Sequence, residues 1–168
     1  RLRDNEADER TRLAGMPASR HAGGGIDEGI YAQDWTRRVY EGLLERAEPV
    51  LRSGRVAILD ATFSRQQQRS RARRFAAERG IPVLLLEACC DEAVVLARLE
   101  RREAEGRDAS DAGPGFYAES VRRFEPPCEW AAEEHVSVHT DKPDWCEGLR
   151  AELERWSRSQ DVQPARLV

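Results

Sequence analysis

Residues 56–63 read Val-Ala-Ile-Leu-Asp-Ala-Thr-Phe, an apolar run that ends in a carboxylate and then a hydroxyl. The stretch from Arg55 to Asp60 is too short and too continuously apolar for a surface helix, so it predicts a buried parallel strand. In open parallel sheets, ligands bind at the carboxyl ends of the strands. Asp60 and Thr62 are therefore the best-placed polar pair in the sequence. In the alternative interpretation, Asp60 only caps the helix that follows.

No phosphate-binding loop accompanies this strand in the sequence. The pattern Gly-x-x-x-x-Gly-Lys-Ser/Thr needs glycines for close backbone approach and a lysine for the phosphates, but Lys142 is the only lysine. The segment from Gly15 to Ala22 imitates the pattern, with Arg20 and His21 in place of its second glycine and its lysine. No apolar strand precedes that segment, so we do not expect it to bind phosphate.

Length and composition favour one α/β domain. The chain has 168 residues, of which 35% are charged, and a net charge of −4. Acidic and basic residues are interspersed, so no face is built for nucleic acid. Almost all basic residues are arginines, which fits phosphate recognition and equally fits a coding bias toward GC-rich codons.

The cysteines and the hydropathy of the chain predict a cytoplasmic protein. Cys89 and Cys90 are adjacent, and Cys128 and Cys146 have no zinc-binding spacing, so reduced thiols are expected. No run approaches the roughly 18 apolar residues of a membrane span, and no signal peptide is recognisable, so no membrane partner is expected. Because the sequence begins at Arg1, we expect a further piece upstream.

Helical and strand patterns alternate along the chain. Apolar residues every three to four positions predict a helix from Asp34 to Ser53, with Val39, Leu43 and Ala47 facing inward. The other predicted elements are a strand end and short helix in 1–14, helices over 65–79, 91–105, 116–124 and 144–156, and strands over 81–87 and 135–139. This alternation predicts an α/β fold with a parallel sheet covered on both faces. We expect a loop over 15–29, a single domain over 1–157 and a frayed tail over 158–168.

A second group of candidate residues follows the predicted helix over 91–105. Arg98, Arg101 and Arg102 lie near its end, ahead of a loop of small residues over 106–111. Arginines on a hinged segment can close over phosphates and neutralise the charge that develops during transfer. In the alternative, they belong to a solvated helix face and pair with the neighbouring glutamates.

Nearly the whole chain, and most clearly the stretch from Ile30 to Arg102, resembles the P-loop kinase-like family of small AAA-type ATP-binding domains. It is most similar to the kinase-like half of bifunctional aminoglycoside-phosphotransferase-like proteins, and more distantly to the kinase domain of polynucleotide kinase. The matching features are Tyr31, Tyr40, Leu43-Leu44, Gly54, Asp60 to Phe63, Arg69, Gly80 to Pro82, and Arg98 to Arg102. The resemblance implies a three-layer parallel sheet of the P-loop kinase type.

The resemblance also implies roles for single residues. Asp60 would hold Mg²⁺ through its water shell and, with Thr62, would serve ATP. Arg98 and Arg102 would be the lid arginines that stabilise the developing charge. Asp4, in the pair Arg3-Asp4, would be the general base toward the acceptor. The partners implied are a nucleotide and an unidentified hydroxyl acceptor, either a small molecule or a polynucleotide end.

The sequence departs from this family in one large respect. The family's first strand, its phosphate loop and the helix behind them have no match in residues 1–168. Since that strand is central in the family's sheet, we expect an apolar slot between strands and no useful phosphoryl transfer by this chain alone. Either the protein extends upstream, or a neighbour fills the slot, or the chain is a decayed remnant. A rival interpretation is a non-catalytic α/β module that docks an upstream domain of the same protein through this slot and its tryptophans.

Overall fold

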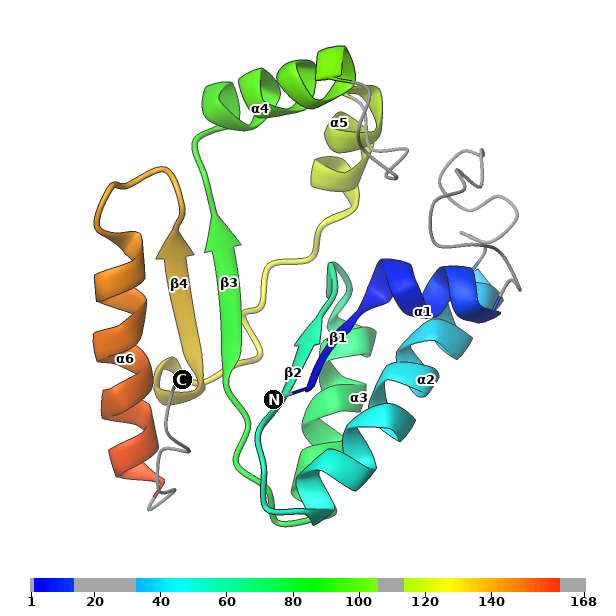
Figure 1. The fold of residues 1–168 in the computed structure, drawn as a ribbon, viewed down its shortest axis with the longest axis vertical. Coiled ribbons are helices and arrows are strands. Elements are labelled where there is room, and N and C mark those ends of the chain that lie inside the picture. The colour runs from blue at the N-terminus through cyan, green and yellow to red at the C-terminus, as the bar shows by residue number, and fades with distance from the viewer. Residues whose placement is uncertain (1, 14–32, 106–113, 161–168) are drawn as a thin grey trace.

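The computed structural model describes residues 2–13, 33–105 and 114–160 (Figure 1). Strands and helices are interspersed through these ranges, so the mixed α/β fold expected from the sequence is confirmed. The elements in chain order are β1 (Leu2–Asn5), α1 (Glu6–Leu13), α2 (Gln33–Arg52), β2 (Ala57–Asp60), α3 (Gln66–Ala77), β3 (Leu85–Cys89), α4 (Glu92–Glu105), α5 (Pro114–Arg123), the 3₁₀ helix η2 (Ala132–Glu134), β4 (His135–His139) and α6 (Trp145–Ser159).

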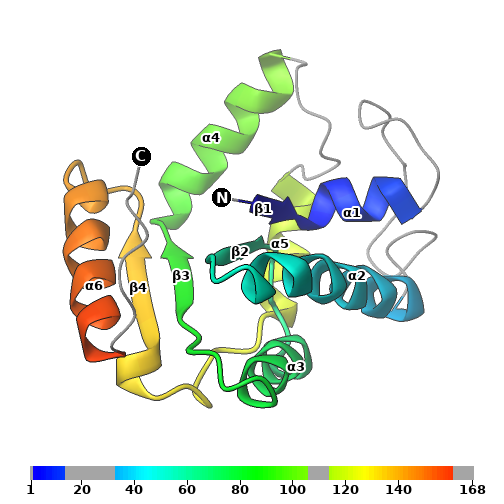
Figure 2. The same ribbon diagram turned by 60° about the horizontal axis from the view of Figure 1, so that its bottom comes forward.

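The described strands form two separate parallel pairs. β1 pairs with β2, and β3 pairs with β4, each in parallel register. Within the described residues, no ladder joins β2 to β3. In Figure 1 the arrows of β3 and β4 run side by side in the same direction, and β2 and β3 are the inner strands in both Figure 1 and Figure 2. The parallel arrangement is as predicted, but the described strands form two pairs and not the single sheet that the alternation of elements and the resemblance both predict.

Several predicted boundaries need correction. The strand predicted over 81–87 is wrong in extent, since β3 covers Leu85–Cys89. Pro82 lacks a backbone N–H, and the ladder starts only where Leu85 meets His135 of β4. The last helix continues past residue 156 to Ser159. The predicted loops over 15–29 and 106–111 and the end of the predicted tail lie outside the described residues.

α2 supplies most of the core. Val39, Leu43, Ala47 and Val50 are buried on one face of this helix, as their spacing predicts. That face contacts both β1 and β2. Gly54 follows the helix with φ of 72°, a left-handed conformation that glycine adopts without steric cost, so the helix ends where expected.

α1 packs on α2 at a point where only glycine fits. The Glu9 side chain is 1% exposed, and its carboxylate accepts a hydrogen bond of 2.8 Å from Arg12 Nε. A Cβ atom on Gly42 of α2 would lie 2.1 Å from Glu9 Oε1. Because Glu9 is buried and held by Arg12, it cannot move aside without loss of that contact.

We therefore expect Gly42→Ala to lower the free energy of unfolding by about 1–3 kcal/mol, the usual cost of overpacking. Gly148→Ala is the matched control, because a Cβ atom at this helical position of α6 meets nothing within 4 Å. That control should raise stability by up to ~1 kcal/mol, since alanine is the better helix former. Urea unfolding of both variants checks the prediction. Equal changes in the free energy of unfolding for the two variants would contradict it.

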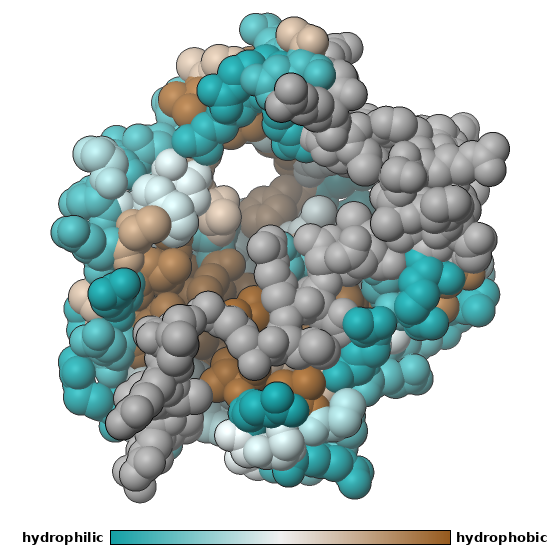
Figure 3. All heavy atoms as spheres, viewed as in Figure 1, coloured by the Kyte–Doolittle hydropathy of each residue, from teal (hydrophilic) through white to brown (hydrophobic). Residues whose placement is uncertain are grey.

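Apolar side chains remain exposed beside the two inner strands. Val56, just before β2, is 54% exposed, Ile58 of β2 is 41% exposed and Leu86 of β3 is 43% exposed. Figure 3 shows the molecule hollowed near its centre, with hydrophobic surface around the hollow. Among the described helices, none is both long and apolar enough to cross a membrane.

Candidate functional site

The carboxyl ends of β1 and β2 lie side by side. Asn5 pairs with Asp60 and Asp4 with Leu59, so both strands end at the same edge. Asp60 therefore lies where parallel sheets bind ligands, as its place in the sequence predicts. Asp4 is one residue before the end of β1; its side chain is outside what the structure describes.

Thr62 is held at this edge by two side chains from elsewhere in the chain. Its backbone N–H donates to Glu6 Oε2 at 2.9 Å, and its hydroxyl lies 3.2 Å from the same oxygen. The hydroxyl of Tyr40, on α2, lies 3.1 Å from Thr62 Oγ1 and donates to Glu6 Oε2 at 3.2 Å. The start of α1, the middle of α2 and the turn after β2 thus meet at one point.

Tyr40 is a buried, neutral phenol. It is 3% exposed, and burial raises its pKa well above the usual range, with the Glu6 charge adding to the rise. A phenol that keeps its proton remains available as a hydrogen-bond donor. Its oxygen also accepts the backbone N–H of Phe63 at 3.0 Å, and the two rings meet edge to face at 5.1 Å.

Phe63 has a strained backbone. Its φ of 42° lies in the left-handed region, which is rare for a bulky side chain. Such conformations persist only where the surroundings fix them, and they cluster at functional sites. Here Tyr40 binds the N–H of Phe63, and the carbonyl accepts a 2.8 Å hydrogen bond from Arg69 Nη1. The turn that carries Thr62 is therefore held on both sides.

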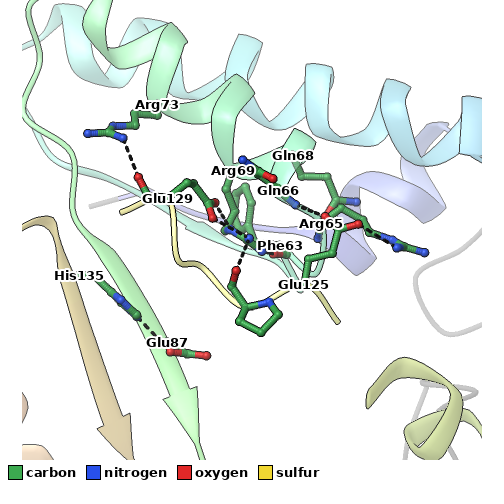
Figure 4. A network of polar contacts seen from close by, with 11 residues as sticks. Phe63, Arg65, Gln66, Gln68, Arg69, Arg73, Glu87, Glu125, Glu129 and His135 are labelled. Carbon is green, nitrogen blue, oxygen red and sulfur yellow. Dashed lines mark hydrogen bonds and ion pairs between the residues drawn. The ribbon is translucent and has the colours of Figure 1, made fainter. Parts of the chain in front are cut away.

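Arg69 is the buried centre of this support. Its side chain is 2% exposed and forms two hydrogen bonds to the Glu129 carboxylate, at 2.6 Å from Nε and 3.1 Å from Nη2. Nη2 also donates to the carbonyl of Pro126 at 3.3 Å. Figure 4 shows Arg69 between Glu129 and Phe63. The hydrogen bond from Arg69 lowers the pKa of Glu129. This carboxyl group therefore stays ionised at pH values at which an ordinary glutamate begins to take up a proton.

Glu125 lies in the segment after α5 and binds the start of α3. Its carboxylate accepts the backbone N–H of Gln66 at 2.6 Å and pairs with Arg65 at 3.0 Å. These two contacts, the backbone one first, lower the pKa of Glu125. The chain after α5 is thus tied to α3 and, through Arg69, to the turn beside Asp60.

The predicted lid arginines belong to the other strand pair. Arg98 of α4 donates to the carbonyl of Thr140 at 3.1 Å, and Thr140 follows β4. The backbone N–H of Thr140 in turn donates to the carbonyl of Cys89, at the end of β3. Arg102 lies one turn further along α4 and is exposed. Arg98 is thus at the carboxyl ends of β3 and β4, and Asp60 at those of β1 and β2.

A metal cluster is not found among the described residues: no group of three or more His, Cys, Asp and Glu side chains could hold an ion. Magnesium needs fewer protein ligands, because it keeps several waters and binds through one or two carboxylates and the substrate phosphates. Asp60, at a strand end two residues before Thr62, is chemically suited to that form of binding.

Neither Glu6 nor Tyr40 was predicted as a site residue, and Tyr40 was named only as a feature of the family resemblance. Glu6 directly follows β1, and a carboxylate at a strand end is a usable signal once residues 2–5 are interpreted as a strand. Tyr40 lies within the apolar face of α2, where its hydroxyl gives no local signal. Its partners are 34 and 22 positions away in the chain.

A family model described as an AAA domain matches residues 1–127, which run from β1 past α5. No curated protein and no solved structure matches the chain.

Proposed function

The chain belongs to the AAA domain family, and from this premise we propose that it is an ATP-binding, kinase-like domain that in its complete form transfers the γ-phosphoryl group of ATP to a hydroxyl group. The acceptor is a small molecule or a polynucleotide end. The observation that carries the proposal is the turn from Asp60 to Phe63, which lies at the carboxyl ends of two parallel strands and is fixed by Glu6, Tyr40 and Arg69. Such rigid placement is what transfer chemistry requires of its polar groups.

Each site residue has a role in this proposal. Asp60 holds Mg²⁺ through water, and Thr62 contacts a phosphate oxygen. When bound, Mg²⁺ neutralises charge on the phosphates and holds them in line for transfer. Arg98 and Arg102 stabilise the charge that develops on the transferred group. Asp4, close to the end of β1, accepts the proton of the acceptor hydroxyl.

A further strand between β2 and β3 completes the site in this proposal. The facing edges of these two strands have no ladder partner within the described residues, and Val56, Ile58 and Leu86 stay exposed beside them. A parallel strand in this slot would end between Asp60 and Arg98. A phosphate loop at that end would join the two halves of the site, which explains why the predicted residues fall into two groups.

Catalysis by residues 1–168 alone is not expected. A phosphate loop supplies several backbone amides and a lysine to the β- and γ-phosphates, and the sequence contains no such loop. Without these donors both ATP binding and transition-state stabilisation lose their main contacts.

The exposed apolar edges favour one other function, a non-catalytic docking module. In that case a strand of a neighbouring domain would fill the slot without bringing a phosphate loop. Ile58 and Leu86 would then bury surface at an interface, as exposed apolar patches commonly do. ATP binding separates the two functions, because only the kinase requires it.

The test is a phosphoryl-transfer assay on an extended chain, in which an apolar strand, a Gly-x-x-x-x-Gly-Lys-Ser/Thr loop and a helix precede Arg1. We expect transfer from ATP to a hydroxyl acceptor, with a rate that falls roughly 100-fold in Asp60→Asn, the scale seen when one electrostatic contact is lost. Asp34→Asn is the control, since the Asp34 side chain is 93% exposed at the start of α2. Equal rates for the two variants would contradict the role of Asp60.

A further inference from the structure

Three donors converge on one carboxylate oxygen at the end of β1. Glu6 Oε2 lies 2.9 Å from the backbone nitrogen of Thr62, 3.2 Å from the Thr62 hydroxyl and 3.2 Å from the Tyr40 hydroxyl. An amide N–H and two hydroxyls that point at one anionic oxygen form a small oxyanion site. Such donor sets bind phosphate oxygens as well as carboxylate oxygens.

The rest of the structure holds these donors in place. Tyr40 is 3% exposed and belongs to the buried face of α2. The turn that carries Thr62 is fixed through Phe63, whose N–H donates to Tyr40 and whose carbonyl accepts from Arg69. The donors are therefore preorganised by α2 and α3, while Glu6 is the first residue of α1.

We propose that Thr62 and Tyr40 form a binding site for one oxygen of a phosphate group, and that the Glu6 carboxylate occupies this site in the present structure. The choice of phosphate as the ligand rests on the proposed function, since a kinase binds and transfers phosphoryl groups. A bound phosphate displaces the Glu6 side chain, and Glu6 returns when the phosphate leaves. Glu6 thus acts as an internal competitor for the site.

An internal competitor weakens the apparent affinity for an external anion. A tethered group is present at high effective concentration, so phosphate binds only to the fraction of molecules in which Glu6 has left. Removal of the carboxylate should therefore strengthen phosphate binding. A variant that removes an equal charge elsewhere should not.

The experiment is a titration of inorganic phosphate into the 168-residue chain, followed by the NMR shift of the Thr62 amide. Mg²⁺ is present, because Asp60 ends the neighbouring strand and its charge would otherwise repel phosphate. We expect Glu6→Ala to bind phosphate at least about 10-fold more tightly than the unmodified chain. Glu45→Ala is the matched control, an exposed glutamate on α2, and should behave like the unmodified chain.

Two further variants identify the site. In the Glu6→Ala background, Thr62→Val should abolish the gain and Thr62→Ser should keep it, because serine retains the hydroxyl. If Glu6→Ala does not fold, Glu6→Gln takes its place, since the neutral amide competes less well than the carboxylate. Phosphate binding that is equal in the Glu6 and Glu45 variants, or that survives Thr62→Val, overturns the proposal.

This outcome is independent of the kinase assay. The proposed function is judged on transfer from ATP by the extended chain, whereas the phosphate site is judged on the Glu6 and Thr62 variants of the 168-residue chain. A failed phosphate titration with intact transfer rejects only the site that Glu6 occupies. The reverse result rejects only the kinase.

Discussion

Replacement of Arg69 by methionine should lower the free energy of unfolding by about 3 kcal/mol. The guanidinium is 2% exposed and ties α3 to Glu129, to the carbonyl of Phe63 and to that of Pro126. Loss of one partner of a buried ion pair costs about 3–5 kcal/mol, because the other charge is left uncompensated. The Glu129 side chain is 18% exposed, so water relieves part of that penalty and the lower end of the range applies.

Arg74→Met on the same helix is the control for this prediction. Arg74 is exposed, and we expect its variant to stay within about 0.5 kcal/mol of the unmodified protein. Urea unfolding measures both. In the double variant Arg69→Met with Glu129→Gln, part of the stability should return, because the uncompensated charge is removed. An Arg69 variant as stable as the Arg74 variant would show that the network does not support the turn.

Addition of a strand between β2 and β3 should also have a large effect on stability. Val56, Ile58 and Leu86 are about half exposed, so their full burial would contribute about 3 kcal/mol in all, half of the usual value for three large apolar side chains. The new ladder bonds would add to this. We therefore expect the extended chain to unfold at a higher urea concentration than the 168-residue chain.

Ile58→Ser shows whether the gain comes from the slot. In the 168-residue chain, where Ile58 is 41% exposed, the substitution should lower the free energy of unfolding only slightly. In the extended chain it should lower the free energy of unfolding by about 2 kcal/mol more, because the hydroxyl would be buried beside the added strand. Val121→Ser on α5 is the control, since Val121 is 53% exposed and its cost should be equal in both chains. If Ile58→Ser lowered the free energy of unfolding equally in the two chains, the added strand would not lie beside Ile58.

Local sequence patterns account for most of the fold. The α2 core follows from the spacing of Val39, Leu43 and Ala47, and Gly54 ends the helix with the positive φ expected of it. The limits of β4 also match the alternation around Val136 and Val138. These features depend on neighbours in the sequence, and local periodicity records them directly. The start of β3 was misplaced, because an apolar run does not show where a partner strand begins.

The site was less accessible to sequence reasoning. Asp60 and Thr62 could be singled out as candidates because a strand end is visible in the local sequence. The role of the groups that fix the turn at Thr62 could not be predicted, since Glu6 and Arg69 act through partners 56 and 60 positions away. Arg98 was predicted as a lid residue from its place near the end of a helix and from the family resemblance, and its hydrogen bond to Thr140, 42 positions on, became visible only in the fold. Side-chain networks between distant segments leave no periodic trace in one sequence.

The most direct measurement is an ATP titration by calorimetry, with Mg²⁺, of the 168-residue chain and the extended chain side by side. If nucleotide binding requires a phosphate loop between β2 and β3, only the extended chain binds ATP in the micromolar range and releases the γ-phosphate. Micromolar binding with turnover by the 168-residue chain alone would contradict this requirement.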